Sequence, residues 1–379
     1  MFHSKSLYLM SLCAVSLVAT LAAQGQAPLF VQTNLVTDSQ AANSARIVDP
    51  NLVNAWGISF APTGPFWVSN NGTGTSTLYR VDPTTDAPTK LGLTVTIPGA
   101  GNVTGQNFNS NTAGGAFNAD NFLFVSEDGT ISGWRGALGT AAETLAAGSA
   151  ANVYKGSAFA TIGTHSYLYE ANFRNGTVDV FKGDVGAPTL VGSFSDPSLP
   201  AGYAPFNVQV LNGKLYVTYA LQDAAKHDDV AGLGNGFVDA FDLNGNLLSR
   251  VGTQGTLDSP WGLTLAPSNF GAYSGDLLVG NFGNGRINAY NLSTNSFVGQ
   301  LSLIGGGLVT IDGLWGLTTG NNAASGSSGA LYFSAGPNGE SHGLFGSIRA
   351  VPEPGQLAYL LGMGVTGLGV ALRMRRRKS

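Results

Sequence analysis

Several carboxylate, amide and imidazole side chains stand within or beside short apolar runs, where a fold could bring them together. Glu170 interrupts the run Tyr167–Ala171, and a carboxylate buried there needs a cation, a hydrogen-bond donor or a raised pKa. Glu170 and His342 are the candidate catalytic acid or base, although Glu170 could equally be a structural carboxylate. Calcium prefers oxygen ligands, and its candidate ligands are Glu170, Asn207, Asn281 and Asp312.

A second group of side chains could bind a sugar or a partner protein instead of reacting. Tryptophan rings provide flat apolar surfaces, and carboxylates and amides hydrogen-bond to hydroxyl groups. Each type also has an ordinary structural role, because tryptophans fill cores, Asp-Gly forms hairpin turns and asparagines cap turns. The candidate binding residues are Trp56, Glu127, Asp128, Asn172, Trp261 and Trp315.

The motifs of several common enzyme classes are absent from the sequence. There is no Gly-x-Ser-x-Gly elbow, no phosphate-binding glycine loop and no His-Glu-x-x-His pair. Cys13 is the single cysteine and lies in an N-terminal apolar stretch, so a chain cleaved after that stretch would carry no thiol. Serine hydrolysis, nucleotide binding and thiolate chemistry are therefore unsupported.

Six repeated units organise the region from 28 to 350. Glycine makes up 54 of the 379 residues, and β-branched and aromatic runs alternate with Asn-Gly and Asp-Gly turns, which is typical of short strands. A Trp-Gly pair occurs at residues 56, 261 and 315. The second strands of the units are predicted at Phe66–Ser69, Phe122–Ser126, Tyr167–Ala171, Lys214–Thr218, Asp276–Gly280 and Ala330–Ala335.

These units predict an all-β fold, a six-bladed β-propeller over residues 28–350. The strand-like segment Leu29–Val36 precedes the first unit and is expected to supply the outer strand of the last blade. A pair of β-sandwiches is the alternative, and the repeated Trp-Gly starts argue against it.

A propeller would gather residues that are distant in sequence. The loop before each innermost strand and the loop after each second strand open on the same face of the ring. The residues placed at that mouth are Asn54, Trp56, Lys155, Asn207, Trp261, Asp312 and Trp315, followed by Asn70, Glu127, Asp128, Glu170, Asn172, Asn281, Asn338, Glu340 and His342. An insertion from Leu221 to Gly234, with Asp223, His227 and Asp228, is predicted either to overhang the mouth or to be a solvated loop.

Both ends of the chain carry segments that indicate export. Lys5 precedes an apolar stretch from Leu7 to Ala23, which is typical of a signal peptide over residues 1–23. The apolar run 357–372 and the basic cluster after it predict a single transmembrane segment with a cytoplasmic end. A buried C-terminal helix is the alternative, but the glycines in the run disfavour it. The candidate sorting residues are Pro352, Glu353, Pro354, Arg373, Arg375, Arg376 and Arg377.

The order of Pro-Glu-Pro motif, apolar segment and basic cluster over 351–379 resembles the PEP-CTERM sorting tail of Gram-negative bacteria. Glu-Asp-Gly-Thr-Ile-Ser-Gly-Trp at 127–134 and Asp-Gly-Leu-Trp-Gly at 312–316 are similar to a family of exported bacterial propellers that often carry this tail. The resemblance implies an exosortase-type protease as a partner, a transient inner-membrane stage, and release to the cell surface or extracellular matrix. It implies no established activity.

The net charge of residues 28–350 limits which ligands this region can bind. Of 18 lysines and arginines, six lie in the terminal segments, whereas only one of 22 acidic residues does, so residues 28–350 carry about −9. This charge disfavours nucleic acid as a partner. We expect a non-catalytic carbohydrate- or protein-binding module, with an exopolysaccharide or a surface protein as its ligand. The alternative is a calcium-dependent hydrolase or lyase, similar to gluconolactonase-like propellers.

Overall fold

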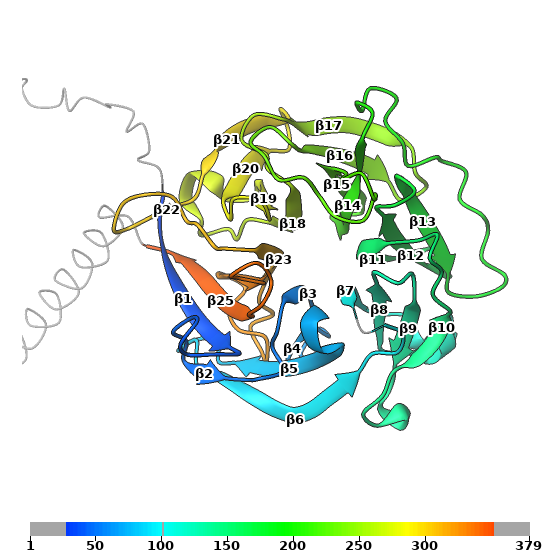
Figure 1. Ribbon diagram of the computed structural model, residues 1–379, viewed down its shortest axis with the longest axis horizontal. Helices are drawn as coiled ribbons and strands as arrows, with labels where there is room; N and C mark the ends of the chain where they lie inside the picture. Colours follow the sequence, from blue (N-terminus) through cyan, green and yellow to red (C-terminus); the bar gives the residue numbers. More distant parts are fainter. Residues whose placement is uncertain (1–27, 101, 352–379) are drawn as a thin grey trace, which may run out of the picture.

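Six mainly antiparallel sheets follow one another around a central axis in the computed structural model, which describes residues 28–100 and 102–351 (Figure 1). In blades 1 to 5 the first strand in sequence lies nearest the axis and the last lies at the rim. The predicted six-bladed β-propeller is therefore confirmed.

The strands of the first three blades follow the chain in order. Blade 1 contains β3 (Ala55–Ser59), β4 (Phe66–Asn70), β5 (Thr75–Val81) and β6 (Pro88–Thr96). Blade 2 contains β7 (Val103–Phe108), β8 (Phe122–Ser126), β9 (Ile131–Trp134) and β10 (Glu143–Ala146). Blade 3 has three strands, β11 (Tyr154–Ile162), β12 (His165–Asn172) and β13 (Thr177–Lys182).

The last three blades complete the ring. Blade 4 contains β14 (Tyr203–Leu211), β15 (Lys214–Leu221), β16 (Phe237–Asp242) and β17 (Leu247–Thr253). Blade 5 contains β18 (Pro260–Leu265), β19 (Leu277–Asn281), β20 (Ile287–Asn291) and β21 (Ser296–Gln300). Blade 6 contains β23 (Leu314–Thr319), β24 (Leu331–Ala335), β25 (Leu344–Ala350) and β1 (Leu29–Thr37), with β2 (Ile47–Val48) and β22 (Ser302–Leu303) beside β1.

Strand β1 closes the ring. It pairs antiparallel with β25, from Phe30 opposite Ala350 to Thr37 opposite Leu344. The prediction that Leu29–Val36 supplies the outer strand of the last blade is therefore confirmed. The first strand of the described chain is thus paired with the last strand. Blade 6 gains its outer strand from a segment that is distant in sequence.

The glycine of each Trp-Gly pair lets neighbouring innermost strands approach each other. A Cβ on Gly316 would lie 2.7 Å from the Trp56 carbonyl oxygen, and one on Gly262 would lie 2.7 Å from the Trp315 carbonyl oxygen. Both distances are shorter than a van der Waals contact. The repeated motif therefore reflects the crowding around the axis of the ring.

A buried carboxylate joins the first and last blades. Asp86, in the turn between β5 and β6, accepts hydrogen bonds from Tyr332 Oη at 3.0 Å, from Ser347 Oγ and from the Arg349 guanidinium at 2.9 Å. Burial alone would raise the pKa of Asp86, but the hydrogen bonds from Arg349 and Ser347 outweigh it and hold the pKa below its ordinary value. The ionised carboxylate therefore stabilises the closed ring.

The predicted signal peptide (1–23), transmembrane segment (357–372) and sorting residues lie outside the described residues, and they stay predictions. Within residues 28–100 and 102–351, no helix has the length and hydropathy needed to cross a bilayer.

We expect Asp86→Asn to lower the free energy of unfolding by about 2 kcal/mol, because an amide can neither pair with the guanidinium nor accept every donor that faces it. Urea denaturation at pH 7 measures the loss. Asp82→Asn is the control, because Asp82 lies in the same turn, is exposed and bonds only locally. Equal stability of the two variants would contradict the role of Asp86 in closure.

Candidate functional site

Aromatic side chains fill the upper part of the central channel. Trp56 stacks on Trp315 with ring centroids 3.6 Å apart, and Phe282 stacks on the other side of Trp315 at 3.9 Å. Trp261 meets both tryptophans edge-on, at 6.1 and 5.8 Å. Because these residues come from blades 1, 5 and 6, they lie across the axis. We call this group, with Phe173 and Phe206, the aromatic plug.

The three tryptophans of the plug are buried. They are 2%, 5% and 1% exposed for Trp56, Trp261 and Trp315. The Trp261 Nε1 donates to the Lys155 carbonyl at 2.9 Å, and the Trp315 Nε1 donates to Asn54 Oδ1 at 3.0 Å. A sugar could not stack on these rings without moving them. The buried rings pack against one another, and two of them hydrogen-bond to Lys155 and Asn54 at the mouth.

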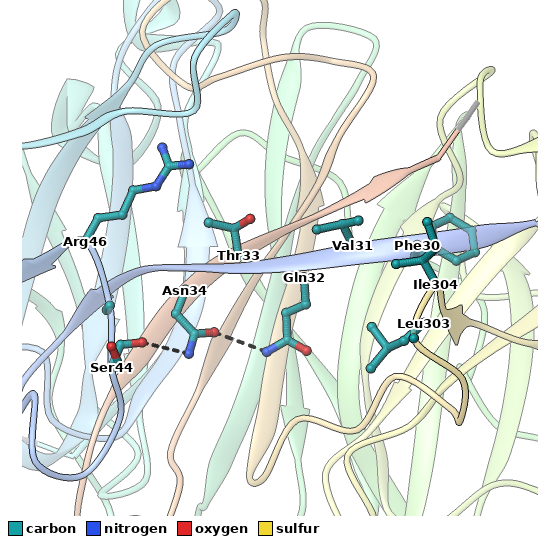
Figure 2. Close-up of a pocket in the computed structure, with 11 residues that line it drawn as sticks. Phe30, Val31, Gln32, Thr33, Asn34, Ser44, Arg46, Leu303 and Ile304 are labelled. Carbon is teal, nitrogen blue, oxygen red and sulfur yellow. Dashed lines mark hydrogen bonds between the residues drawn. The ribbon is translucent and has the colours of Figure 1, made fainter. Parts of the chain in front are cut away.

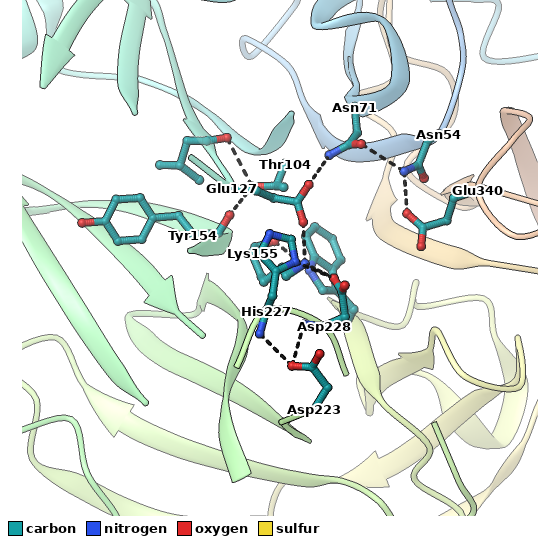
Figure 3. Close-up of polar contacts among 12 residues, drawn as sticks. Asn54, Asn71, Thr104, Glu127, Tyr154, Lys155, Asp223, His227, Asp228 and Glu340 are labelled. Atoms are coloured by element: carbon teal, nitrogen blue, oxygen red, sulfur yellow. Dashed lines mark hydrogen bonds and ion pairs between the residues drawn. The ribbon is translucent and has the colours of Figure 1, made fainter. Parts of the chain in front are cut away.

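A buried lysine stands directly above the plug. Lys155 is 2% exposed, and its ammonium lies 5.5 Å from the centroid of the Trp56 ring. The ammonium donates to Glu127 Oε1 and to Asp228 Oδ1, the latter at 3.0 Å (Figure 3). Burial alone would lower the pKa of Lys155, but the two carboxylates outweigh it and hold the pKa above its ordinary value. Lys155 is therefore a cation at neutral pH and a poor nucleophile or base.

A chain of hydrogen bonds extends from this ion pair across the mouth. Asn71 Nδ2 donates to Glu127 Oε2 at 3.0 Å, and Asn54 Nδ2 donates both to Asn71 Oδ1 at 3.2 Å and to Glu340 Oε2 at 2.6 Å. Burial raises the pKa of Glu340, and the hydrogen bond from Asn54 offsets part of that rise. We call Lys155, Glu127, Asp228, Asn71, Asn54 and Glu340 the mouth cluster.

The backbone at two members of the mouth cluster adopts a left-handed conformation. Asn54 has φ 49° and Glu340 has φ 66°. A left-handed residue other than glycine costs about 1 kcal/mol, and asparagine tolerates it better than glutamate. The fold therefore holds Glu340 against a local preference in order to point it at Asn54, which is a pattern typical of binding sites.

The insertion in blade 4 overhangs the mouth, as one reading of the sequence predicted. Asp228 reaches Lys155 from that insertion, and His227 Nδ1 lies 2.9 Å from Asp228 Oδ1. Asp223 Oδ1 accepts the backbone N–H of His227 at 2.8 Å and orders the turn. Ligand atoms of Glu127, His227 and Asp228 lie within 4.8 Å of one another.

The four predicted calcium ligands do not form one constellation. Asn207 donates to the Trp261 carbonyl at 2.8 Å, Asn281 donates to the Thr256 carbonyl at 2.8 Å, and Asp312 accepts the Asn338 backbone N–H at 2.7 Å. The first contact joins the inner strands of blades 4 and 5, the second ties β19 to the segment before blade 5, and the third lies within the loops of blade 6. These three side chains thus each have a structural partner.

Glu170 is buried on β12, as its position in an apolar run predicted. It is 1% exposed, stands opposite Asp179 of β13, and its Oε1 has no hydrogen-bond partner in the described part of the chain. Burial raises the pKa of Glu170 well above its ordinary value, and the nearby Asp179 raises it further. Both effects favour the protonated form of Glu170. Its place in the middle strand of blade 3 separates it from the mouth cluster.

The remaining predicted residues lie in turns and loops, except Asn172, which is the last residue of β12. His342 Nδ1 lies 2.8 Å from Asp38 Oδ2, in a contact that ties β25 to the end of β1. Asp128 accepts the backbone N–H groups of Ala100 and Thr130, and Asn172 donates to Asp179 at 2.7 Å. Their roles as catalytic or binding residues stay predictions.

Sequence reasoning placed Lys155, Glu127 and Glu340 at the mouth but did not identify Lys155 as their central cation. It missed Asn71, which follows β4 directly and joins Glu127 to Asn54. A signal was present, because Lys155 follows Tyr154 at the start of an inner strand, where the channel leaves no room for an unpaired charge.

Fold and site together define a six-bladed β-propeller whose channel is closed by aromatic rings beneath a polar mouth. No protein-family model matches the chain. Uncharacterized protein R648 of Acanthamoeba polyphaga mimivirus is 30% identical over 333 residues, covering 82% of this chain and 78% of that protein. Uncharacterized protein L690 of the same virus is 30% identical over 321 residues, covering 79% and 81%. The chain belongs to the family of these two proteins.

These relatives correct one expectation from the sequence. The chain was assigned by resemblance to a family of exported bacterial proteins with PEP-CTERM tails, and that assignment is wrong, because the relatives are encoded by a virus. The propeller that the resemblance implied is nevertheless present.

Solved structures of other proteins align with most of this chain. A streptogramin B lyase is 10% identical with a TM-score of 0.48, covering 86% of this chain and 100% of that one. The PQQ-bound aldose sugar dehydrogenase of Streptomyces coelicolor is 15% identical with a TM-score of 0.45, covering 79% and 96%. At these values the likeness carries no inference about activity.

We expect the Lys155–Glu127 pair to show strong energetic coupling. Lys155→Met should lower the free energy of unfolding by about 3 kcal/mol, because it leaves a largely buried carboxylate without its cation. Glu127→Gln in the same chain should restore part of that loss, giving a coupling energy of at least about 1 kcal/mol in a double-mutant cycle. Urea denaturation of the four proteins measures it, and additive losses would show that the pair is not formed.

We expect Glu170→Gln to change the pH dependence of stability. A buried acid with a raised pKa contributes stability that is complete below its unfolded pKa and is lost as pH rises toward the folded pKa. The variant lacks that loss, so it should match the wild type near pH 4 and exceed it in melting temperature at pH 8. Asp184→Asn, at a partly exposed carboxylate of the same blade, is the control. A variant that melts lower at pH 8 would indicate an ionised, hydrogen-bonded Glu170.

Proposed function

We propose that the propeller is a non-catalytic binding module and that the mouth cluster holds a neutral carbohydrate. The observation that carries this proposal is the Lys155 ammonium, which is buried, protonated and shared by Glu127 and Asp228. This arrangement neutralises the charges that a catalytic site would keep free. Below it lie the buried rings of the aromatic plug.

The groups around the ion pair suit hydroxyl groups. Glu127, Glu340 and Asp228 are at least partly exposed and offer carboxyl groups, and Asn54 and Asn71 hold two of them in a fixed arrangement. Such groups hydrogen-bond sugars without reacting with them. Carboxylates outnumber ammonium groups in the mouth cluster, and residues 28–350 are acidic. Both facts favour a neutral glycan over an acidic one. A partner protein is the other ligand class that such a rigid face could take.

A second candidate is a calcium-dependent hydrolase or lyase. The observation that favours it is the group formed by Glu127, His227 and Asp228, whose ligand atoms lie close enough to share a cation. Against it, Lys155 already donates to two of these three residues, so calcium would have to displace a buried ammonium. The donor set is nevertheless chemically suitable, because carboxylate oxygens bind hard cations.

We further propose that the chain works outside the cell in which it is made. The apolar stretch from Leu7 to Ala23, which is typical of a signal peptide, supports export. An extracellular polysaccharide or a surface protein is the corresponding ligand.

A glycan array probed with the intact chain tests the proposed function. We expect neutral glycans to bind better than sialylated or sulfated ones, and Asn71→Ala to weaken binding at least about tenfold by removing two hydrogen bonds of the cluster. Asn244→Ala, at an exposed turn of blade 4, is the matched control. Excess calcium should leave the melting temperature unchanged. A calcium-dependent rise together with turnover of a lactone or glycan substrate would favour the enzyme.

A further inference from the structure

The outer edge of β1 is only partly paired. Strand β22 covers it at Leu29 and Phe30, and β2 covers it at Val36 and Thr37, both in the parallel direction. Between these two short pairings, the described chain gives residues 31–35 no strand partner on that edge. The edge therefore contains a gap of five residues, whose first and last Cα atoms are about 13 Å apart.

Backbone hydrogen-bonding groups face this gap. The Phe30 carbonyl accepts from the Ile304 N–H at 3.0 Å, and the Asn34 carbonyl accepts from the Arg46 N–H at 3.3 Å, both on the outer edge. Alternate residues of a strand present their backbone groups to the same edge. The N–H and C=O of Gln32 therefore point into the gap, where an added strand would find one donor and one acceptor.

The gap is the floor of a groove with walls at both ends. The groove has a volume of 740 Å³ and is lined by Phe30–Asn34, by residues 44–46 and by residues 303–305. Figure 2 shows Gln32 and Asn34 on the same side of β1, between Ser44 at one wall and Leu303 at the other. Asn34 Nδ2 donates to the Ser44 carbonyl at 3.0 Å and fixes that wall.

Strand β1 itself lacks the devices that usually protect an open strand edge, and the charged lining residue Arg46 donates to the carbonyls of Thr85 and Asp86. Proteins discourage pairing at such edges with charged side chains or proline, whereas Val31–Asn34 reads Val-Gln-Thr-Asn. Val31 is 43% exposed and Ile304 is 56% exposed, so apolar surface stands at the β22 end of the groove. The walls, and not charge, limit what can pair here.

The position of the gap between β22 and β2 limits which segments can pair with β1 there. A second copy could not pair β1 with β1, because each strand edge is set back between its own two walls. The terminal segments of the chain continue from Pro28 and Val351, next to Leu29, at the end of β1 that β22 already covers. Strand β22 therefore lies between Pro28 and Val351 and the gap. A free extended peptide meets neither obstacle.

We propose that this groove is a strand-addition site for a short, extended, uncharged peptide segment of a partner protein. The segment continues the ladder that β22 and β2 begin, with its backbone on Gln32 and an apolar side chain beside Ile304. Main-chain hydrogen bonds provide the attraction, and the two walls limit the bound length to about four or five residues. This surface lies at the rim of blade 6, apart from the mouth cluster.

A capped synthetic pentapeptide of alternating valine and threonine, labelled with a fluorophore, tests the proposal on the full chain. We expect saturable binding by fluorescence anisotropy and slower hydrogen exchange in residues 29–37. Methylation of the peptide's backbone nitrogens should weaken binding about tenfold, because it removes main-chain donors but keeps the side chains. Ser44→Trp should block the groove, and Ser195→Trp, at an exposed serine on another blade, should not.

Equal binding of the methylated and unmethylated peptides would overturn the proposal, since attraction would then come from side chains alone. Equal binding by the two tryptophan variants would overturn it as well. A third contradicting result is protection of residues 31–35 before any peptide is added, with chemical cross-links from Ser44→Cys to residues 352–379, because the chain's own segment would then be the occupant. Glycan binding at the mouth is unaffected in all of these cases.

Discussion

Crowding of the innermost strands around the axis is the constraint from which the rest of the structure follows. Where one strand passes the next, there is no room for a Cβ, so Gly262 and Gly316 face backbone carbonyls at a distance that a side chain could not occupy. The tryptophan beside each of the glycines 57, 262 and 316 then packs against the other two, Trp56 stacked on Trp315 and Trp261 edge-on to both. The aromatic rings bury the base of the mouth. A charged side chain that lies there is shielded from water and therefore needs a partner of opposite charge. The Lys155 ammonium with Glu127 and Asp228 is that pairing, and the amides and Glu340 extend it.

Much of this fold could be predicted from the sequence because its repeats are local. Each predicted second strand overlaps an observed one, and β1 closes the last blade as expected, since alternating apolar residues and Asn-Gly turns report on strands directly. The burial of Glu170 followed from the same alignment. Blade 3 differs, because no fourth strand follows β13 and the chain after Lys182 packs Phe194 against Tyr169 instead. The sequence pattern after Lys182 does not distinguish a loop from an outer strand.

The site was harder to predict because its contacts join residues far apart in the chain. Asp228 meets Lys155 across 73 positions and Asn54 meets Glu340 across 286. The propeller rule placed many of them at one mouth, but it could not tell which carboxylate finds a cation and which finds a backbone amide. The bacterial resemblance failed for a related reason. Trp-Gly motifs follow from the packing constraint at the axis, and unrelated chains of this fold can share them. The 30% identity to protein R648, over 82% of the chain, instead indicates common descent.

The charge of the Lys155 amine decides whether the mouth cluster is a charge-neutralised binding site or holds a free base. Nuclear magnetic resonance of the protein with ¹³Cε-labelled lysine, assigned by comparison with Lys155→Arg, would follow the titration of Lys155 directly. The account predicts that this ammonium remains protonated beyond the ordinary lysine range, because Glu127 and Asp228 outweigh the effect of burial. A pKa displaced toward neutrality would mean that Lys155 is available as a base or nucleophile. That result would contradict a charge-neutralised, non-catalytic mouth.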